Sequence, residues 1–190
     1  DQFGALRLFD IAAGGFSYRV FMTPSCLQID VSLAPAELFG ALGPNFRLLF
    51  GKSVTRSTSP AVPAEQMFGQ AVHHALRARV SIERGRFWQA EYWLSQTRQL
   101  VLYLLCLDHS LPPSLGRGID DLPADVRARF LATLVGDLRP DTLESALREV
   151  VRELLKGPGG TQDMAAQVRP GLVCMARRQS LWTHEPPQTR

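Results

Sequence analysis

The chain has 190 residues, of which 45% are hydrophobic, and this apolar content is ample for one large or two small globular domains. Its 21 basic and 18 acidic residues give a formal net charge of +3 without a long basic run, so nucleic acid is not indicated as the main partner. The apolar run at 100–107 is far shorter than the ~20 residues that cross a bilayer, so we expect no membrane partner.

The first part of the chain reads as strands. Apolar and polar residues alternate at 5–13, 16–22 and 26–33, and turn residues separate these runs at 14–15 and 23–25, which is the pattern of a β-meander. A short helix, an apolar segment and a loop rich in Ser, Thr and Pro are then expected at 34–42, 45–51 and 52–63. We place a domain boundary at the end of that loop, so that the domains are 1–62 and 63–190.

After this boundary the apolar period changes to about 3.6 residues, which predicts helices. The predicted helices lie at 64–85, 86–110, 123–138, 141–157 and, interrupted by Pro170 and Gly171, 161–182. In the first, the apolar residues at this spacing are Met67, Val72, Leu76, Val80 and near neighbours. Asp141 and Glu144 have the spacing of a capping box at the start of the fourth. The last residues, 183–190, are expected to be frayed.

Several other residues are assigned no chemistry. Cys26, Cys106 and Cys174 are far apart in the sequence, and we expect reduced, mostly buried thiols in a cytoplasmic protein. The adjacent His73 and His74 point about 100° apart on a helix and therefore cannot chelate one ion together, so packing or surface roles are expected. The arginines of this region are expected to be solvated: Arg77, Arg79, Arg84 and Arg86.

Asp30 is the first residue that suggests chemistry. It lies inside the alternating run CLQIDVSL at 26–33, and an aspartate within a strand needs solvent, a partner or a cation. If Leu27, Ile29 and Val31 pack on a core, Asp30 lies with Gln28 and Ser32 on the opposite face. A hard cation such as magnesium prefers oxygen ligands of this kind. The plainer interpretation is a strand aspartate in solvent.

The longer string from Tyr18 to Gly51 resembles the later part of the catalytic domain of bacterial nucleotidyltransferase-domain proteins. These belong to the superfamily of aminoglycoside nucleotidyltransferases and DNA polymerase beta. The resemblance rests on RVF at 19–21, LQIDVSL at 27–33 and GPNFRLLFG at 43–51. It implies that Asp30 is the third acidic residue of a magnesium site. In the superfamily the other two acids come from an upstream GS segment and an Asp-x-Asp pair, which these residues lack, so we expect a preceding segment to supply them.

A second group of polar and aromatic residues falls on one face of the helix predicted at 86–110. Trp88, Glu91, Tyr92, Ser95 and Arg98 have helical spacing. The apolar residues occupy the opposite face: Phe87, Ala90, Leu94, Val101 and Leu105. The first set suits a nucleotide or sugar-like ligand, with rings for stacking, an arginine for phosphate and a carboxylate for a hydroxyl. The alternative is that Glu91 and Arg98 make structural ion pairs between helices.

This second string also resembles the helical domain of these nucleotidyltransferases, in which a helical carboxylate can act as the acceptor base. The expected fold is therefore α+β, a partial nucleotidyltransferase sheet domain followed by a substrate- and nucleotide-binding helical bundle. The resemblance implies Mg²⁺-dependent transfer of a nucleoside monophosphate from a nucleoside triphosphate to a small hydroxylated acceptor. Asp30 and Glu91 would be catalytic, and Trp88, Tyr92, Ser95 and Arg98 would bind the nucleotide.

At this level the sequence leaves alternatives for the function, the assembly and the substrates. The alternative function is a non-catalytic nucleotidyltransferase-like module with a binding, antitoxin or regulatory role, because two of the three acids are missing from the chain. Helical faces of this kind often pair, so a homodimer is one expected assembly. The acceptor and the preferred base cannot be derived from short motifs, because pocket shape decides both.

Overall fold

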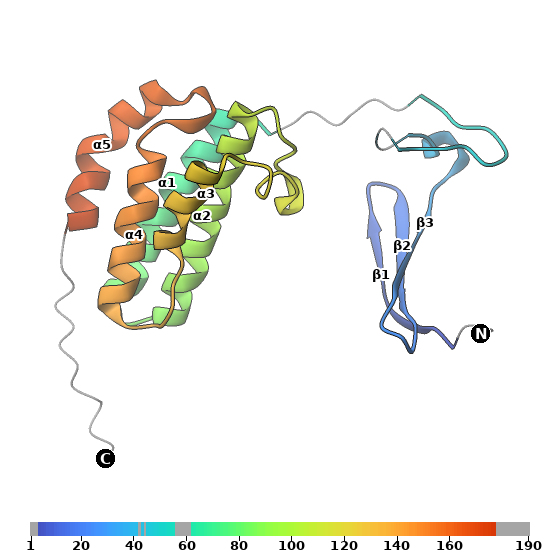
Figure 1. The fold of residues 1–190 in the computed structure, drawn as a ribbon, viewed down its shortest axis with the longest axis horizontal. Coiled ribbons are helices and arrows are strands. Elements are labelled where there is room, and N and C mark those ends of the chain that lie inside the picture. Colours follow the sequence, from blue (N-terminus) through green and yellow to red (C-terminus); the bar gives the residue numbers. More distant parts are fainter. Residues whose placement is uncertain (1–3, 42, 44, 56–61, 178–190) are drawn as a thin grey trace, which may run out of the picture. The chain divides into compact units, whose positions relative to one another are not determined.

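The computed structural model describes residues 4–41, 43, 45–55 and 62–177. Its elements are labelled in Figure 1 and divide into two compact units, 1–60 and 61–190. The first unit contains a three-stranded sheet and the second contains the α-helices, so the expected α+β class is confirmed. Part of the predicted interdomain loop, 56–61, lies outside the described residues, as does the end of the chain from residue 178.

The sheet is an antiparallel meander in the order β1, β2, β3. The strands are β1 (Leu6–Ala13), β2 (Phe16–Met22) and β3 (Gln28–Leu33), and they confirm the three predicted strands. Gly14 and Gly15 form the first turn at positive φ, 58° and 82°, a conformation that glycine reaches without a Cβ clash. The helix expected at 34–42 is reduced to one 3-10 turn, η1 (Ala36–Leu38).

Most of the apolar surface of this sheet is exposed. Among the described residues of the unit, the buried hydrophobic side chains are Phe16 and Val20. The face of β3 that was expected to pack on a core is 37% to 61% exposed at Leu27, Ile29, Val31 and Leu33. The physical reason is that a small sheet buries an apolar face only against a helix or a second sheet, and η1 is the one helical element in the described part of this unit.

The described residues of the second unit form five α-helices and three 3-10 turns. The helices are α1 (Ala64–Glu83), α2 (Phe87–Asp108), α3 (Ala124–Phe130), α4 (Pro140–Leu154) and α5 (Gln162–Arg177). The turns are η2 (Ser114–Gly116), η3 (Leu131–Thr133) and η4 (Pro158–Gly160). None of the described helices is long and apolar enough to span a membrane.

The core of this unit is built on small residues of α1. Phe68, Ala71, Ala75, Ala78 and Ile82 are fully buried, with the spacing of one helical stripe. The predicted helix is confirmed, and of the apolar residues that gave its period, Met67 is buried whereas Leu76 and Val80 are 45% and 39% exposed. Alanines at the contact let α2 and α4 approach closely, so the larger apolar residues of the adjacent stripe stay outside.

The apolar face predicted for α2 is confirmed. Ala90, Leu94 and Val101 are fully buried, and Phe87 and Leu105 pack against the core in a partly buried state. The expectation of mostly buried thiols is wrong, however, because Cys106 is buried whereas Cys26 and Cys174 are exposed.

Proline does not interrupt α5. The helix runs through Pro170, which was expected to break it. Leu172 and Ala176 beyond the proline are buried, and the Arg169 guanidinium donates to the Leu155 carbonyl at 2.7 Å. Tertiary packing on both sides of the proline thus offsets the loss of one backbone hydrogen bond.

An arginine of α1 and a glutamate of α4 form a buried ion pair. Arg79 is 4% exposed and contacts Glu83 Oε1 at 2.9 Å through Nε and Glu144 Oε1 at 3.4 Å through Nη1. The expectation that Arg79 is solvated was therefore wrong, because α4 covers its side of α1. Glu144 is not part of a capping box either: Arg139 is the N-cap residue of α4, and no side chain caps it.

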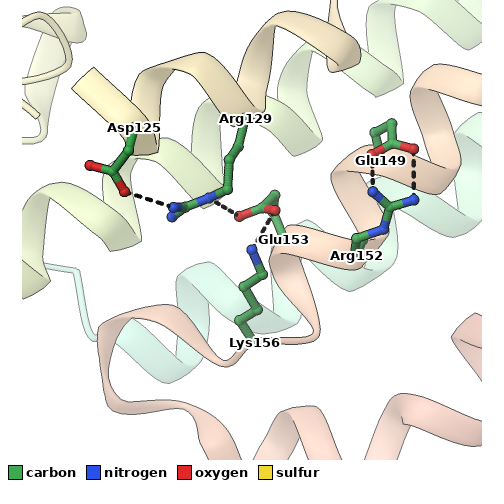
Figure 2. A network of polar contacts seen from close by, with 6 residues as sticks. All are labelled: Asp125, Arg129, Glu149, Arg152, Glu153 and Lys156. Atoms are coloured by element: carbon green, nitrogen blue, oxygen red, sulfur yellow. Dashed lines mark hydrogen bonds and ion pairs between the residues drawn. The ribbon is translucent and has the colours of Figure 1, made fainter. Parts of the chain in front are cut away.

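A second polar network joins α3 to α4 (Figure 2). Glu153 is 7% exposed and accepts from Arg129 Nε at 3.2 Å and from Lys156 Nζ at 2.6 Å. Arg129 also contacts Asp125 at 3.2 Å within α3. The buried carboxylate of Glu153 therefore has two cationic partners, both of which remain partly exposed to water.

Removal of Arg79 should destabilise the chain more than removal of Arg129. Arg79→Met leaves the Glu144 carboxylate buried without this cation, and the free energy of unfolding should fall by about 3 kcal/mol. Arg129→Met leaves Glu153 with Lys156, so the loss should be about 1 kcal/mol. Urea unfolding monitored by circular dichroism measures both values, and equal losses would contradict the importance of the buried pair.

Candidate functional site

Asp30 lies in the middle of β3 on an exposed surface. The register places Gln28, Asp30 and Ser32 directly opposite Met22, Val20 and Tyr18 of β2, and residues that are opposite in an antiparallel pair share a face. The predicted grouping of Asp30 with Gln28 and Ser32 therefore follows from the strand geometry. This face is also the one that carries the buried Val20.

The Asp30 carboxylate has one polar partner among the described residues. Gln28 Nε2 donates to Asp30 Oδ1 at 3.0 Å and to Oδ2 at 3.1 Å. The partner is a neutral amide, so no described cation neutralises the carboxylate. The described residues contain no group of three or more His, Cys, Asp or Glu side chains that could hold a metal ion. Asp30 can thus provide one ligand, and these residues alone do not fit a magnesium site.

The other carboxylate of the described strands belongs to an ion pair that the sequence analysis missed. Arg19 donates to Asp10 through Nε at 3.0 Å and Nη2 at 2.9 Å. This hydrogen bond, with the charges of Arg19 and Arg7, lowers the pKa of Asp10 below its ordinary value. The sequence held a signal for the pair, because a two-residue turn at Gly14 and Gly15 aligns Asp10 with Arg19.

In α2 the structure brings together three of the five residues predicted for the second site. Ser95 Oγ donates to Glu91 Oε1 at 2.6 Å, and Arg98 Nη2 donates to Ser95 Oγ at 2.7 Å. Arg98 Nη1 donates to the Thr133 carbonyl of η3 at 2.6 Å. Arg98 is thus held within the helical unit and is joined to Glu91 by hydrogen bonds through Ser95.

Burial affects the charge equilibrium of the Arg98 guanidinium. Desolvation lowers the pKa of its guanidinium, and attraction to the charge of Glu91 opposes that change. An arginine remains protonated at neutral pH even when its pKa is lowered. The guanidinium therefore acts as a fixed hydrogen-bond donor within the helical unit.

The two aromatic residues of the predicted site are exposed. Trp88 is 79% and Tyr92 is 53% exposed, so both rings are available for stacking. Trp88 lines an open hollow of about 430 Å³ formed by residues 85–89 at the start of α2. A second hollow of about 380 Å³ in the sheet unit is lined by Phe39 and residues 47–52, which do not include Asp30.

His73 and His74 have the packing role that was expected. The His74 ring lies 5.0 Å from the Trp93 ring, and the His73 ring lies 6.4 Å from it. The Arg77 guanidinium stands 5.2 Å from the centroid of the same ring. His74 Nδ1 and Trp93 Nε1 are buried and have no hydrogen-bond partner among the described residues. Burial, assisted by the neighbouring His73, lowers the pKa of His74.

These contacts predict a pH-dependent loss of stability. The unfolded chain has the ordinary His pKa of about 6.5, whereas the folded pKa of His74 is lower, so the unfolded state binds more protons below that value. Stability is therefore complete above about pH 6.5 and falls as the pH drops through the folded pKa. His74→Gln should reduce this loss between about pH 7 and pH 5.5, as measured by thermal unfolding. His109→Gln, outside the cluster, is the control, and the same pH dependence in both variants would exclude His74 as the cause.

The chain was also compared with known proteins. It matches no protein-family model, and no curated protein or solved structure is similar to it at a significant level.

Proposed function

We propose that the protein is a magnesium-dependent nucleotidyltransferase that transfers a nucleoside monophosphate from a nucleoside triphosphate to a hydroxyl of a small molecule. The observation that carries this proposal is the exposed Asp30 at the centre of β3, in the string that resembles the third acidic strand of the superfamily. Its carboxylate has an amide partner rather than a cation. That state supports a role in binding an ion that other acids must share.

Magnesium in such a site lowers the pKa of an acceptor hydroxyl and stabilises the leaving pyrophosphate. Asp30 would be one of its oxygen ligands. The described residues do not complete the ligand set, so the proposal requires two further carboxylates from outside them. In the superfamily these come from the segment before the strands.

In the helical unit, Glu91 would accept the proton of the acceptor hydroxyl. A general base must present a carboxylate oxygen to its substrate within hydrogen-bond reach. Glu91 is partly buried and is held by Ser95 through one oxygen. Trp88 and Tyr92, which are exposed on the same helix, would contact the nucleotide or the acceptor by stacking.

A non-catalytic module is the second candidate function. It is favoured by the finding that Asp30 has no acidic companions for metal binding among the described residues. A protein of this kind would keep the nucleotidyltransferase-like surface and bind a nucleotide or a partner without transfer. The two candidates differ in one measurable property, which is the dependence of nucleotide binding on magnesium.

Substitution of Asp30 should weaken nucleotide binding in the presence of magnesium. Asp30→Asn keeps the size of the side chain but removes the charge that a hard cation requires. Isothermal titration of the intact protein with MgATP and MgGTP should show binding that this variant weakens severely. Glu37→Gln, another exposed carboxylate of the same unit, should leave binding unchanged. Unchanged binding in Asp30→Asn would remove Asp30 from the site and favour the non-catalytic function.

A further inference from the structure

We propose that Ser95 and Arg98 are positioning residues for Glu91, and that the Thr133 carbonyl anchors them. This inference rests on the proposed function, because it assigns Glu91 the part of acceptor base. It differs from the sequence-based expectation, in which Ser95 and Arg98 contact the nucleotide directly. The path runs from the Thr133 carbonyl through Arg98 and Ser95 to Glu91.

The chemistry of the three groups sets the direction of each hydrogen bond. A guanidinium only donates, so Ser95 Oγ must accept from Arg98 at 2.7 Å. The single proton of the Ser95 hydroxyl is then directed to Glu91 Oε1, which lies 2.6 Å away. This oxygen must accept, as a carboxylate oxygen does. Arg98 thus orients the hydroxyl, and the hydroxyl orients the carboxylate.

The anchor of this path is rigidly packed. Thr133 is fully buried, and its hydroxyl donates to the Phe130 carbonyl at 2.6 Å, which fixes the turn η3. Arg98 is partly buried and bridges α2 to that turn over 35 positions of sequence. A group held from two elements loses less freedom on binding a ligand than one held from a single helix.

The Ser95 hydroxyl stands between the Arg98 guanidinium and the Glu91 carboxylate. One oxygen of that carboxylate is therefore left open, that is, without a hydrogen bond among the described residues. In the pair of Asp10 and Arg19, the guanidinium engages both oxygens directly, as bidentate pairs do. Ser95 engages Oε1 of Glu91 alone, and no hydrogen bond or ion pair to Oε2 is found among the described residues. The open oxygen is the one that can accept a proton from a bound hydroxyl.

The path itself can be tested without any activity. The ¹⁵N resonances of the Arg98 guanidinium in the intact protein report its two hydrogen bonds. Glu91→Gln should shift these resonances, because it changes the acceptor to which the Ser95 hydroxyl is directed. Gln99→Ala is the control, since Gln99 lies beside Arg98 in sequence but pairs with the Tyr103 hydroxyl instead. An Arg98 spectrum that does not respond to Glu91→Gln would overturn the path, whatever the protein catalyses.

The positioning role is tested by nucleotidyl transfer to the acceptor identified for the intact protein. Ser95→Ala should lower kcat roughly tenfold to a hundredfold, the scale of a misplaced catalytic group, with a small change in KM, and Ser95→Thr should restore kcat. In a plot of kcat against pH, the acid limb should move in Ser95→Ala and return to its wild-type position in Ser95→Thr. Full activity in Ser95→Ala would overturn the positioning role. If the wild-type protein gives no transfer while the Arg98 spectrum behaves as expected, the proposed function fails, and with it the role assigned to the path.

Discussion

Close contact between α1 and α2 is the constraint on which the helical unit depends. Alanines at 71, 75 and 78 of α1 and at 90 of α2 are fully buried, and their small side chains allow the backbones to approach. Larger residues such as Phe68, Leu94 and Leu104 fill the space that remains. Most polar groups near this contact then find a partner inside the fold or remain at its edge, and the exceptions among the described residues are His74 Nδ1 and Trp93 Nε1.

The polar groups near this contact follow both courses. Ser81 and Thr97 donate their hydroxyls to carbonyls of the preceding turn, at 2.8 Å in each case. Arg79 extends from α1 to α4, where it forms an ion pair with the buried Glu144. Arg98 reaches to η3 and is joined to Glu91 through Ser95. Ser95 and Arg98, which were considered for function, are thus held by hydrogen bonds within the helical unit.

The sheet unit differs from the helical unit because it lacks such a close-packed contact among its described residues. Its strands are well defined by the turn at Gly14 and Gly15 and by cross-strand pairing, but large apolar side chains remain exposed on it. A surface of this kind in a stable protein is normally covered by another layer. Asp30 therefore lies on a sheet whose surface is covered only in part by the described residues of its own unit.

The sequence by itself determined the three strands and the approximate positions of the long helices, because strand and helix periods and turn residues act over a few positions. The three strands and the apolar face of α2 follow from such short-range rules. The pairing of Asp10 with Arg19, which was not predicted, obeys the same turn rule. Only the tertiary structure decided which stripe of α1 is buried and why α5 continues through Pro170. It also decided the partners of Arg79 and Arg98, which lie 65 and 35 positions away in the chain. Contacts of that range depend on how helices pack, and a period read along one helix contains no information about its neighbour.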